Sequence, residues 1–169
     1  MLAFDQSSVR TGWSCFDGTD LMNFGLIDLS DLPVGERLNA MALRIHELAE
    51  RYNPETIVME GVVYQRNVST LITLANLQGM IFEICRARGA NRCVLPPTAW
   101  RRQLEIRQGA GIKREELKKQ AVALIYASYG IYVDEDVCEA ICIGLGWLKA
   151  NGRLPDLQEI AKKRDFKEK

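Results

Sequence analysis

The 169-residue sequence contains a single histidine and no pair of cysteines in a C-x-x-C spacing. Its five cysteines are an odd number, which is typical of buried thiols in a reducing compartment rather than of a disulfide framework. Two of them, Cys138 and Cys142, lie four residues apart on a predicted helix, but the one histidine, His46, lies on a different helix. The sequence therefore lacks the nitrogen and sulfur ligands that a zinc site needs.

Long apolar runs are also missing. No segment approaches the roughly 20 consecutive apolar residues of a membrane span, and no basic segment is followed by an apolar stretch and a cleavage site. We therefore expect a soluble, cytoplasmic protein with no membrane partner. The length and the 47% hydrophobic content suit one domain, which we assign to residues 1–155, followed by a charged tail over residues 156–169.

Neither sign of charge is in excess, since 22 basic residues balance 22 acidic ones. The charges are unevenly distributed, however. From Arg86 to Lys119 there are ten Lys or Arg against three Glu, whereas residues 1–85 carry five basic and eleven acidic side chains. This pattern indicates a surface that follows a phosphate backbone, beside a site that holds metal ions. An ordinary solvated helix face is the alternative explanation of the basic segment.

Apolar periodicity predicts an α/β fold. The predicted strands cover residues 1–5, 11–17, 21–29, 56–59 and 92–95, and the first three form an antiparallel meander. The predicted helices cover residues 35–52, 68–88, 98–102, 113–128 and the segment that opens at 134. A right-handed crossover through the first helix would place the fourth strand parallel to the first.

Carboxylates stand where several of these elements end or begin. Asp5 ends the first strand and Glu60 ends the fourth, so the two acids lie side by side if those strands pair. They would then repel each other strongly unless one is protonated or a cation lies between them. Asp136 and Glu139 are three residues apart and project from one face of the last helix. Capping and the helix dipole explain the acids of its first turn, but they explain Glu139 poorly.

A cluster of Asp and Glu without His or Cys favours Mg²⁺ or Mn²⁺ over zinc. Two such ions about 4 Å apart would neutralise the cluster, activate a water and stabilise the leaving 3′ oxygen of a phosphodiester. The predicted reaction is therefore phosphodiester hydrolysis with two metal ions in each active site.

The predicted helix over residues 68–88 is apolar around most of its circumference, so it should be buried on two sides. The sheet can cover one side in a domain of this size. We expect a second copy of the chain to cover the other side, which predicts a homodimer through Val68–Arg88.

The loop at residues 107–112 contains two glycines but matches neither G-x-G-x-x-G nor a Walker pattern, which argues against a nucleotide cradle. A hinge near DNA suits this loop better. Before it, Thr98 can cap a short basic helix that carries Arg101 and Arg102.

Three groups of residues occur in order along the chain. They are Phe4-Asp5-Gln6-Ser7-Ser8 with Thr11-Gly12-Trp13, the segment from Glu60 to Asn67 leading into Ser69-Thr70 and Leu77-Gln78-Gly79, and Asp136-x-x-Glu139-Ala140. Together they resemble the RuvC family of Holliday junction resolvases, over residues 2 to about 150. The resemblance implies a ribonuclease H-like fold, with a mixed five-stranded sheet in the order 3-2-1-4-5 and helices on both faces. It also implies a homodimer that resolves four-way DNA junctions with Mg²⁺ or Mn²⁺.

The resemblance also assigns roles to residues. It implies that Asp5, Glu60, Asp136 and Glu139 are the catalytic, metal-binding acids, and that Arg102 and Lys113 contact phosphates of the strand that is cut. Lys113 is further a candidate catalytic residue, either as a general acid or only as a phosphate contact. We extend the predicted DNA-binding set to Arg101, Arg66, Asn67, Tyr64 and Arg107.

The sequence departs from the family pattern in three places. The last acid is Glu139 where the family usually has Asp, and Val63, followed by Tyr64, stands where the family places an aromatic that contacts bases. The chain also begins only four residues before Asp5. The short lead before Asp5 predicts that the natural start lies further upstream. The departure at Val63 predicts relaxed sequence selectivity, which together with the small size indicates a divergent or phage-type member, acting in the cytoplasm of a bacterium or of an infected host.

Other functions remain open at this point. A nuclease of the same fold could act more broadly on branched DNA or on structured RNA. A junction-binding protein without activity is a second alternative, against which the presence of all four acids argues. The actin-like sugar kinases and ATPases share the fold, but their phosphate turn contains Gly, and Gln6-Ser7-Ser8 does not.

Overall fold

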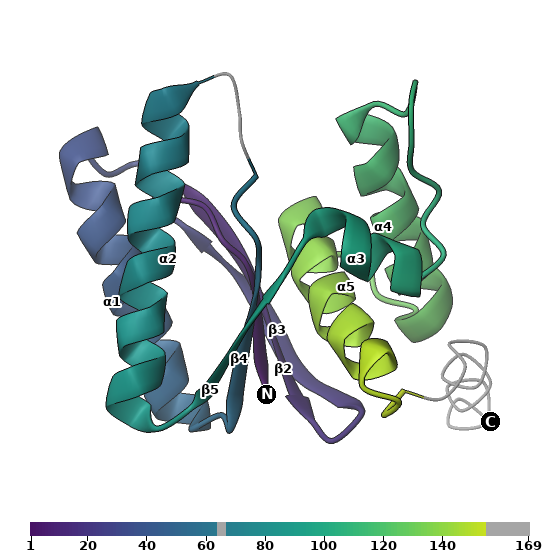
Figure 1. Cartoon of the computed structure of the whole chain (residues 1–169), viewed down its shortest axis with the longest axis horizontal. Helices are drawn as coiled ribbons and strands as arrows, with labels where there is room; N and C mark the ends of the chain where they lie inside the picture. The colour runs from purple at the N-terminus through teal and green to yellow at the C-terminus, as the bar shows by residue number, and fades with distance from the viewer. Residues whose placement is uncertain (64–66, 155–169) are drawn as a thin grey trace.

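The computed structural model describes residues 1–63 and 67–154, which form an open sheet flanked by helices (Figure 1). The strands are β1 (Leu2–Asp5), β2 (Arg10–Asp17), β3 (Asp20–Asp28), β4 (Thr56–Glu60) and β5 (Asn91–Leu95). The helices are α1 (Val34–Tyr52), α2 (Val68–Arg88), α3 (Pro97–Gln103), α4 (Arg114–Tyr129) and α5 (Glu135–Ala150). The predicted tail at residues 156–169 lies outside the described residues.

The strand order is β3-β2-β1-β4-β5, which confirms the predicted mixed sheet. β1 pairs antiparallel with β2 and parallel with β4, and β4 pairs parallel with β5. β1 is central and buried on both faces, which explains its uninterrupted apolar run from Leu2 to Phe4. Figure 1 shows α1 and α2 on one face of the sheet and α5 on the other, with α3 and α4 packed beside α5.

Side-chain alternation along the central strands divides the core into two parts. Leu2 and Phe4 of β1 lie in the cluster that includes the buried residues of α1 and α2. Ala3 of β1 and Val58 of β4 lie in the opposite cluster, together with α3, α4 and α5. The acids at the strand ends therefore stand between two well-packed layers, on a rigid support.

Helix α5 is the most deeply buried helix among the described residues. Two of its glycines permit this position, because a Cβ on Gly144 would lie 2.4 Å from the Phe16 ring. A Cβ on Gly146 would lie 2.7 Å from the Cβ of Trp100. The helix can therefore approach both the sheet and α3 closely, which fixes the depth of its N-terminal acids.

Two local predictions at helix starts are wrong. Thr98 does not cap α3, which begins at Pro97 with Pro96 as its N-cap and no side-chain cap. Proline suits the first helical position because its fixed φ is already helical and it has no N–H to satisfy. Lys113 is the N-cap of α4 rather than its first helical residue. The bounds of α2, in contrast, are the predicted ones.

A further correction concerns the apolar character of helix α2. By length and composition alone it is one helix among the described residues that could cross a membrane, contrary to the expectation that no run comes close. Its inner side packs on the sheet through Leu77, Ile81 and Ile84, as predicted. Its outer side leaves Val68 and Ile72 more than half exposed. The sequence therefore predicted the burial of one side, while the other side is open in the isolated chain.

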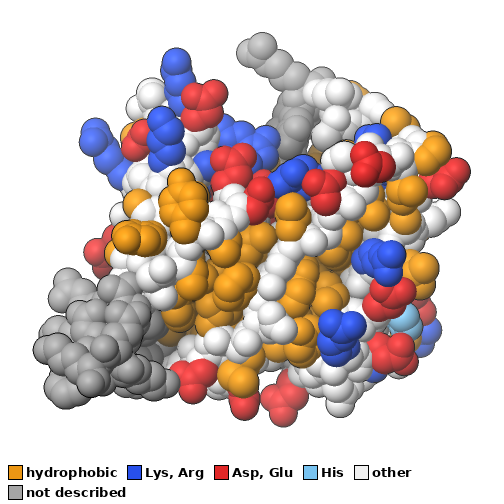
Figure 2. Space-filling model, turned by 180° about the vertical axis from the view of Figure 1, so that it is seen from behind, with side chains coloured by type: hydrophobic (Ala, Val, Ile, Leu, Met, Phe, Trp, Pro, Cys, Tyr) orange, Lys and Arg blue, Asp and Glu red, His pale blue; other side chains and the backbone are white. Residues whose placement is uncertain are grey.

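Strand β3 forms one edge of the sheet, at the back of the molecule in Figure 1. Figure 2 shows this back face, where hydrophobic side chains gather in the middle and charged side chains surround them. β3 itself has charged residues only at Asp20 and Asp28. Its charges therefore stand at the two ends of the strand, where they give this edge little protection against pairing with a strand of another chain.

Candidate active site

Strands β1 and β4 bring the first two acids to the same edge of the sheet. Phe4 lies opposite Met59 in the parallel register, so Asp5 and Glu60 are the next residues on each strand. Beyond β1, the side-chain amide of Gln6 continues the pairing. It donates to the Glu60 carbonyl at 2.5 Å and accepts from the Glu60 backbone N–H at 3.1 Å. Gln6 thereby fixes the backbone of Glu60 beside Asp5.

The N-terminus of α5 brings the other two acids to this edge. Asp134 caps the helix by accepting a hydrogen bond from the backbone N–H of Asp136 at 3.0 Å. Gly12, which lies opposite Asp5 on β2, makes the approach possible. A Cβ at Gly12 would lie 2.0 Å from the carbonyl oxygen of Asp136, which is far inside van der Waals contact. The absence of a side chain at this position therefore allows the acids of α5 to reach Asp5.

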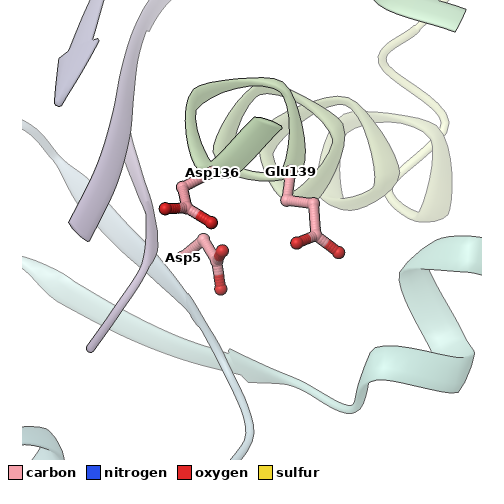
Figure 3. A group of neighbouring side chains, drawn as sticks. All are labelled: Asp5, Asp136 and Glu139. Atoms are coloured by element: carbon pink, nitrogen blue, oxygen red, sulfur yellow. The ribbon is translucent and has the colours of Figure 1, made fainter. Parts of the chain in front are cut away.

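Three carboxylates meet as a result. Figure 3 shows Asp5 on β1 facing Asp136 and Glu139 on α5, and one oxygen of each lies within 4.8 Å of the others. Burial raises the pKa of Asp5 well above its usual range, and repulsion from Glu139, Glu60 and Asp136 adds to the effect. The pKa of Glu139 is also raised, mainly by burial. The site therefore concentrates negative charge in a poorly solvated place, where a cation is favourable.

Glu60 lies at the side of this group and is joined to it by α3. The indole N–H of Trp100 donates to Glu60 Oε1 at 2.8 Å. The guanidinium of Arg101 lies 3.7 Å from the same oxygen and 3.5 Å from Glu139 Oε1, and it stacks over the Trp100 ring. Burial raises the pKa of Glu60, while the Trp100 hydrogen bond opposes this. Three of the four predicted acids thus form a compact group, and Arg101 connects the fourth to Glu139.

Two cations that sequence reasoning missed also belong to the site. Lys118 of α4 places its ammonium 2.9 Å from Asp136 Oδ1, 2.6 Å from Glu135 and 3.9 Å from Glu139. Arg10 of β2 lies 3.3 Å from Asp136 Oδ2 through its Nε, and its other nitrogens pair with Asp134 and Asp28. No local pattern marks either residue, because each reaches the acids only through the packing of its element against α5.

The predicted DNA-binding residues take different positions. Arg101 is directed into the acidic group, and 15% of its side chain is exposed, whereas Arg102, Arg107 and Lys113 are exposed. Arg114, which sequence reasoning also missed, is close enough to lower the pKa values of both Glu60 and Glu139.

The remaining predicted contacts lie in the loop before α2. Asn67 is exposed and caps α2 by accepting a hydrogen bond from the backbone N–H of Thr70 at 3.3 Å. Tyr64 and Arg66 lie outside the described residues. Val63, at the start of this gap, is half exposed.

The donor set fits a hard divalent cation. All of the converging ligands are carboxylate oxygens, and the thiol of Cys138, next to Glu139 in the chain, is turned to the backbone carbonyl of Val133. Trp100, Gln6 and Arg10 hold the surrounding groups in place, as the supporting partners of a metal site commonly do.

Comparison with solved structures finds proteins that share the mixed-sheet fold described above. The chain is similar to Thermus thermophilus RuvC in complex with a Holliday junction substrate, with a TM-score of 0.69 and 15% identity over 89% of this chain and 93% of the other. It is also similar to the yeast mitochondrial Holliday junction resolvase Ydc2, with a TM-score of 0.57 and 16% identity over 98% of this chain and 81% of the other. At these identities the likenesses show a shared fold, within which three carboxylates of this chain meet at one edge of the sheet.

Sequence comparison identifies the family. A family model described as "Crossover junction endodeoxyribonuclease RuvC" matches residues 1–103, and the chain belongs to the RuvC family. It is 23% identical over 156 residues to the protein of that name from Dictyoglomus thermophilum, covering 88% of this chain and 95% of the relative. The match to the Dictyoglomus turgidum protein is 26% identical over 102 residues and covers 57% of this chain and 65% of the relative.

Proposed function

We propose that this chain resolves four-way DNA junctions as a structure-selective endonuclease that hydrolyses phosphodiesters with two metal ions. The observation that carries the proposal is the meeting of Asp5, Asp136 and Glu139 within 4.8 Å at one edge of a RuvC-family sheet. The Thermus thermophilus relative was solved in complex with a Holliday junction substrate. This is the substrate class that we assign to the present chain.

The four acids would hold the ions, and Mg²⁺ or Mn²⁺ is the ion that an all-carboxylate donor set favours. Metal ions bound there would activate the attacking water and stabilise the leaving 3′ oxygen. The protein's part is to fix the ligands: Trp100 orients Glu60, Gln6 holds its backbone, and Arg10 orients Asp136. Two carboxylates anchored on strands and two on a buried helix give the positional precision that catalysis needs.

Exposed cations on the segments packed against α5 would supply the contacts to DNA. Arg102 on α3 and Lys113 at the start of α4 lie on the two elements that flank α5, and Arg107 lies between them in the chain. Their charges would neutralise backbone phosphates on a branched substrate, which makes binding dependent on salt concentration. Lys113 serves as a phosphate contact in this arrangement, since it is exposed and Arg114 is the neighbour whose charge acts on the acids.

A homodimer through α2 completes the proposal. The outer side of α2 exposes Val68, Ile72, Ala75 and Gly79 at successive helical turns. Ala75 and Gly79 end this stripe near the middle of the helix, where small residues allow two helices to approach closely, and burying the stripe removes the exposed apolar surface from water. Two copies related by a twofold axis would present two active sites to the symmetric strands of a four-way junction.

Cleavage of an immobile synthetic four-way junction with Mg²⁺ tests the proposal, with wild type and Asp5→Asn compared on native and denaturing gels. We expect paired, symmetric nicks that disappear in Asp5→Asn, while the variant still binds the junction. Linear duplex, a DNA flap and a structured RNA serve as competing substrates. If RNA or flaps are cut and the junction is left intact, the fold assignment stands and the assigned substrate is wrong.

A further inference from the structure

The ammonium of Lys118 occupies an unusual position for a lysine. Its side chain is only 14% exposed, and it lies within 4 Å of oxygens from Glu135, Asp136 and Glu139. It contacts two of the acids that the proposed function assigns to metal binding. An ammonium group is a compact cation that binds carboxylates as a point charge, so it can stand where a metal ion would otherwise neutralise them.

Asp136 shows the consequence most clearly. Lys118 donates to its Oδ1 at 2.9 Å, and Arg10 donates to its Oδ2 at 3.3 Å. Both oxygens of this carboxylate are therefore engaged by side-chain cations. A metal ion that binds Asp136 in this arrangement competes directly with one of the two contacts.

The charge of the site leads to the same conclusion. Asp5, Glu60, Asp136 and Glu139 carry four negative charges when ionised, and Lys118 and Arg101 offset two of them, while Arg10 divides its charge among Asp136, Asp134 and Asp28. The remaining charge matches one divalent ion, whereas two ions need the charge of all four carboxylates. Arg101 is held by stacking on Trp100 and by contacts with two acids. Lys118, at the end of a flexible four-carbon side chain, is the cation that can move away.

We infer that Lys118 substitutes for one of the two metal ions in the metal-free protein and has to leave Asp136 and Glu139 before that ion binds. This inference rests on the proposed function, because it takes these acids as metal ligands. Lys118 thus holds the acids together in the absence of metal and lowers the affinity of the site for metal. It acts as a positioning residue for the acids.

The inference predicts opposite changes in two properties when Lys118 is replaced: the metal-free protein loses stability, and its affinity for metal rises. Replacing a lysine with only a structural role would weaken both. Without Lys118, the metal-free protein should be less stable, because the acids repel each other without their countercharge. Metal should bind more tightly, because no resident cation competes for Asp136. Changes to groups that support metal ligands typically alter metal affinity by about 10–100-fold, and we expect a gain of at least about tenfold here.

Binding of Mn²⁺ alone, measured by isothermal titration calorimetry without DNA, tests this directly. Lys118→Met and Lys118→Gln are compared with wild type and with Lys119→Met, which removes the same charge from an exposed position on the same helix. We expect the Lys118 variants to bind Mn²⁺ about tenfold more tightly, which corresponds to about 1.4 kcal/mol. Their thermal unfolding midpoints should lie below wild type without metal and rise more than wild type when Mn²⁺ is added.

Affinity in both Lys118 variants equal to or weaker than that of Lys119→Met would overturn the inference. So would a wild-type protein that binds no Mn²⁺, since there would be no ion for Lys118 to replace. Tighter Mn²⁺ binding in the variants, together with a wild type that leaves four-way junctions uncut, would uphold the role of Lys118 and reject the proposed substrate.

Discussion

Gly12→Ala is the change that tests most directly how the active site is assembled. The new Cβ would lie 2.0 Å from the Asp136 carbonyl oxygen, 2.4 Å from its carbonyl carbon and 2.8 Å from the backbone nitrogen of Val137. All three atoms belong to the backbone of α5 and have no flexible side chain to rotate away. Because Cβ contacts below 3.0 Å essentially never occur, the N-terminus of α5 must retreat from β2 by about 1 Å.

A retreat of this size separates Asp136 and Glu139 from Asp5. Displacements of about 1 Å in a catalytic arrangement can reduce the rate about 100-fold, and we expect a loss of that order in the single-turnover rate of junction cleavage with Mg²⁺. Overpacking of this kind costs about 1–3 kcal/mol of stability, so the protein should still fold at 25 °C. Junction binding without metal, measured by gel mobility shift, should be little changed because α3 and the loop after it are untouched.

Gly35→Ala is the matched control, because a Cβ there meets nothing within 4 Å on the first turn of α1. It should cut at the wild-type rate and be slightly more stable, since alanine loses less conformational freedom than glycine on folding. If folded Gly12→Ala protein cleaves junctions within a factor of about three of the wild-type rate, the loss falls far short of the expected one. That result would refute the idea that β2 and α5 must touch to place the acids.

Two further predictions concern the acids themselves. Trp100→Phe removes the indole N–H that donates to Glu60 but keeps an aromatic ring against α5, so the Mg²⁺ concentration for half-maximal cleavage should rise about tenfold. Trp147→Phe, near the end of α5 and beside Arg153, should leave that concentration unchanged. Burial and neighbouring acids raise the pKa of Asp5 in the folded protein. Between the ordinary and the raised pKa, the native state therefore binds more protons than the unfolded state. The stability of the protein falls as the pH rises through that window. Without metal, Asp5→Asn should therefore be more stable than wild type at pH 7, with the difference shrinking toward pH 4. Thermal unfolding across this pH range measures the difference, and a variant less stable than wild type at pH 7 would contradict the reasoning.

The sequence by itself determined the elements and the acids at their ends. The apolar run before Asp5 and the one before Glu60 predicted central strands, because a strand buried on both faces has no polar alternation. Their parallel pairing followed from the crossover rule, and that pairing places the two acids at one edge of the sheet. The spacing of Asp136 and Glu139 likewise fixed that they share a helix face. These are local patterns, and strand and helix periods are readable over a few residues.

Only the tertiary structure decided how the acids are neutralised and supported. The sequence grouped Arg101 with Arg102 as DNA contacts, but the packing of α3 against α5 turns Arg101 toward Glu60 and Glu139 and leaves Arg102 exposed. In the same way, Lys118 is one of several basic residues on an amphipathic helix until α4 packs against α5 and delivers its ammonium to Asp136. Such contacts join residues far apart in the chain, and they depend on rotations and depths of packed helices that no short sequence period encodes.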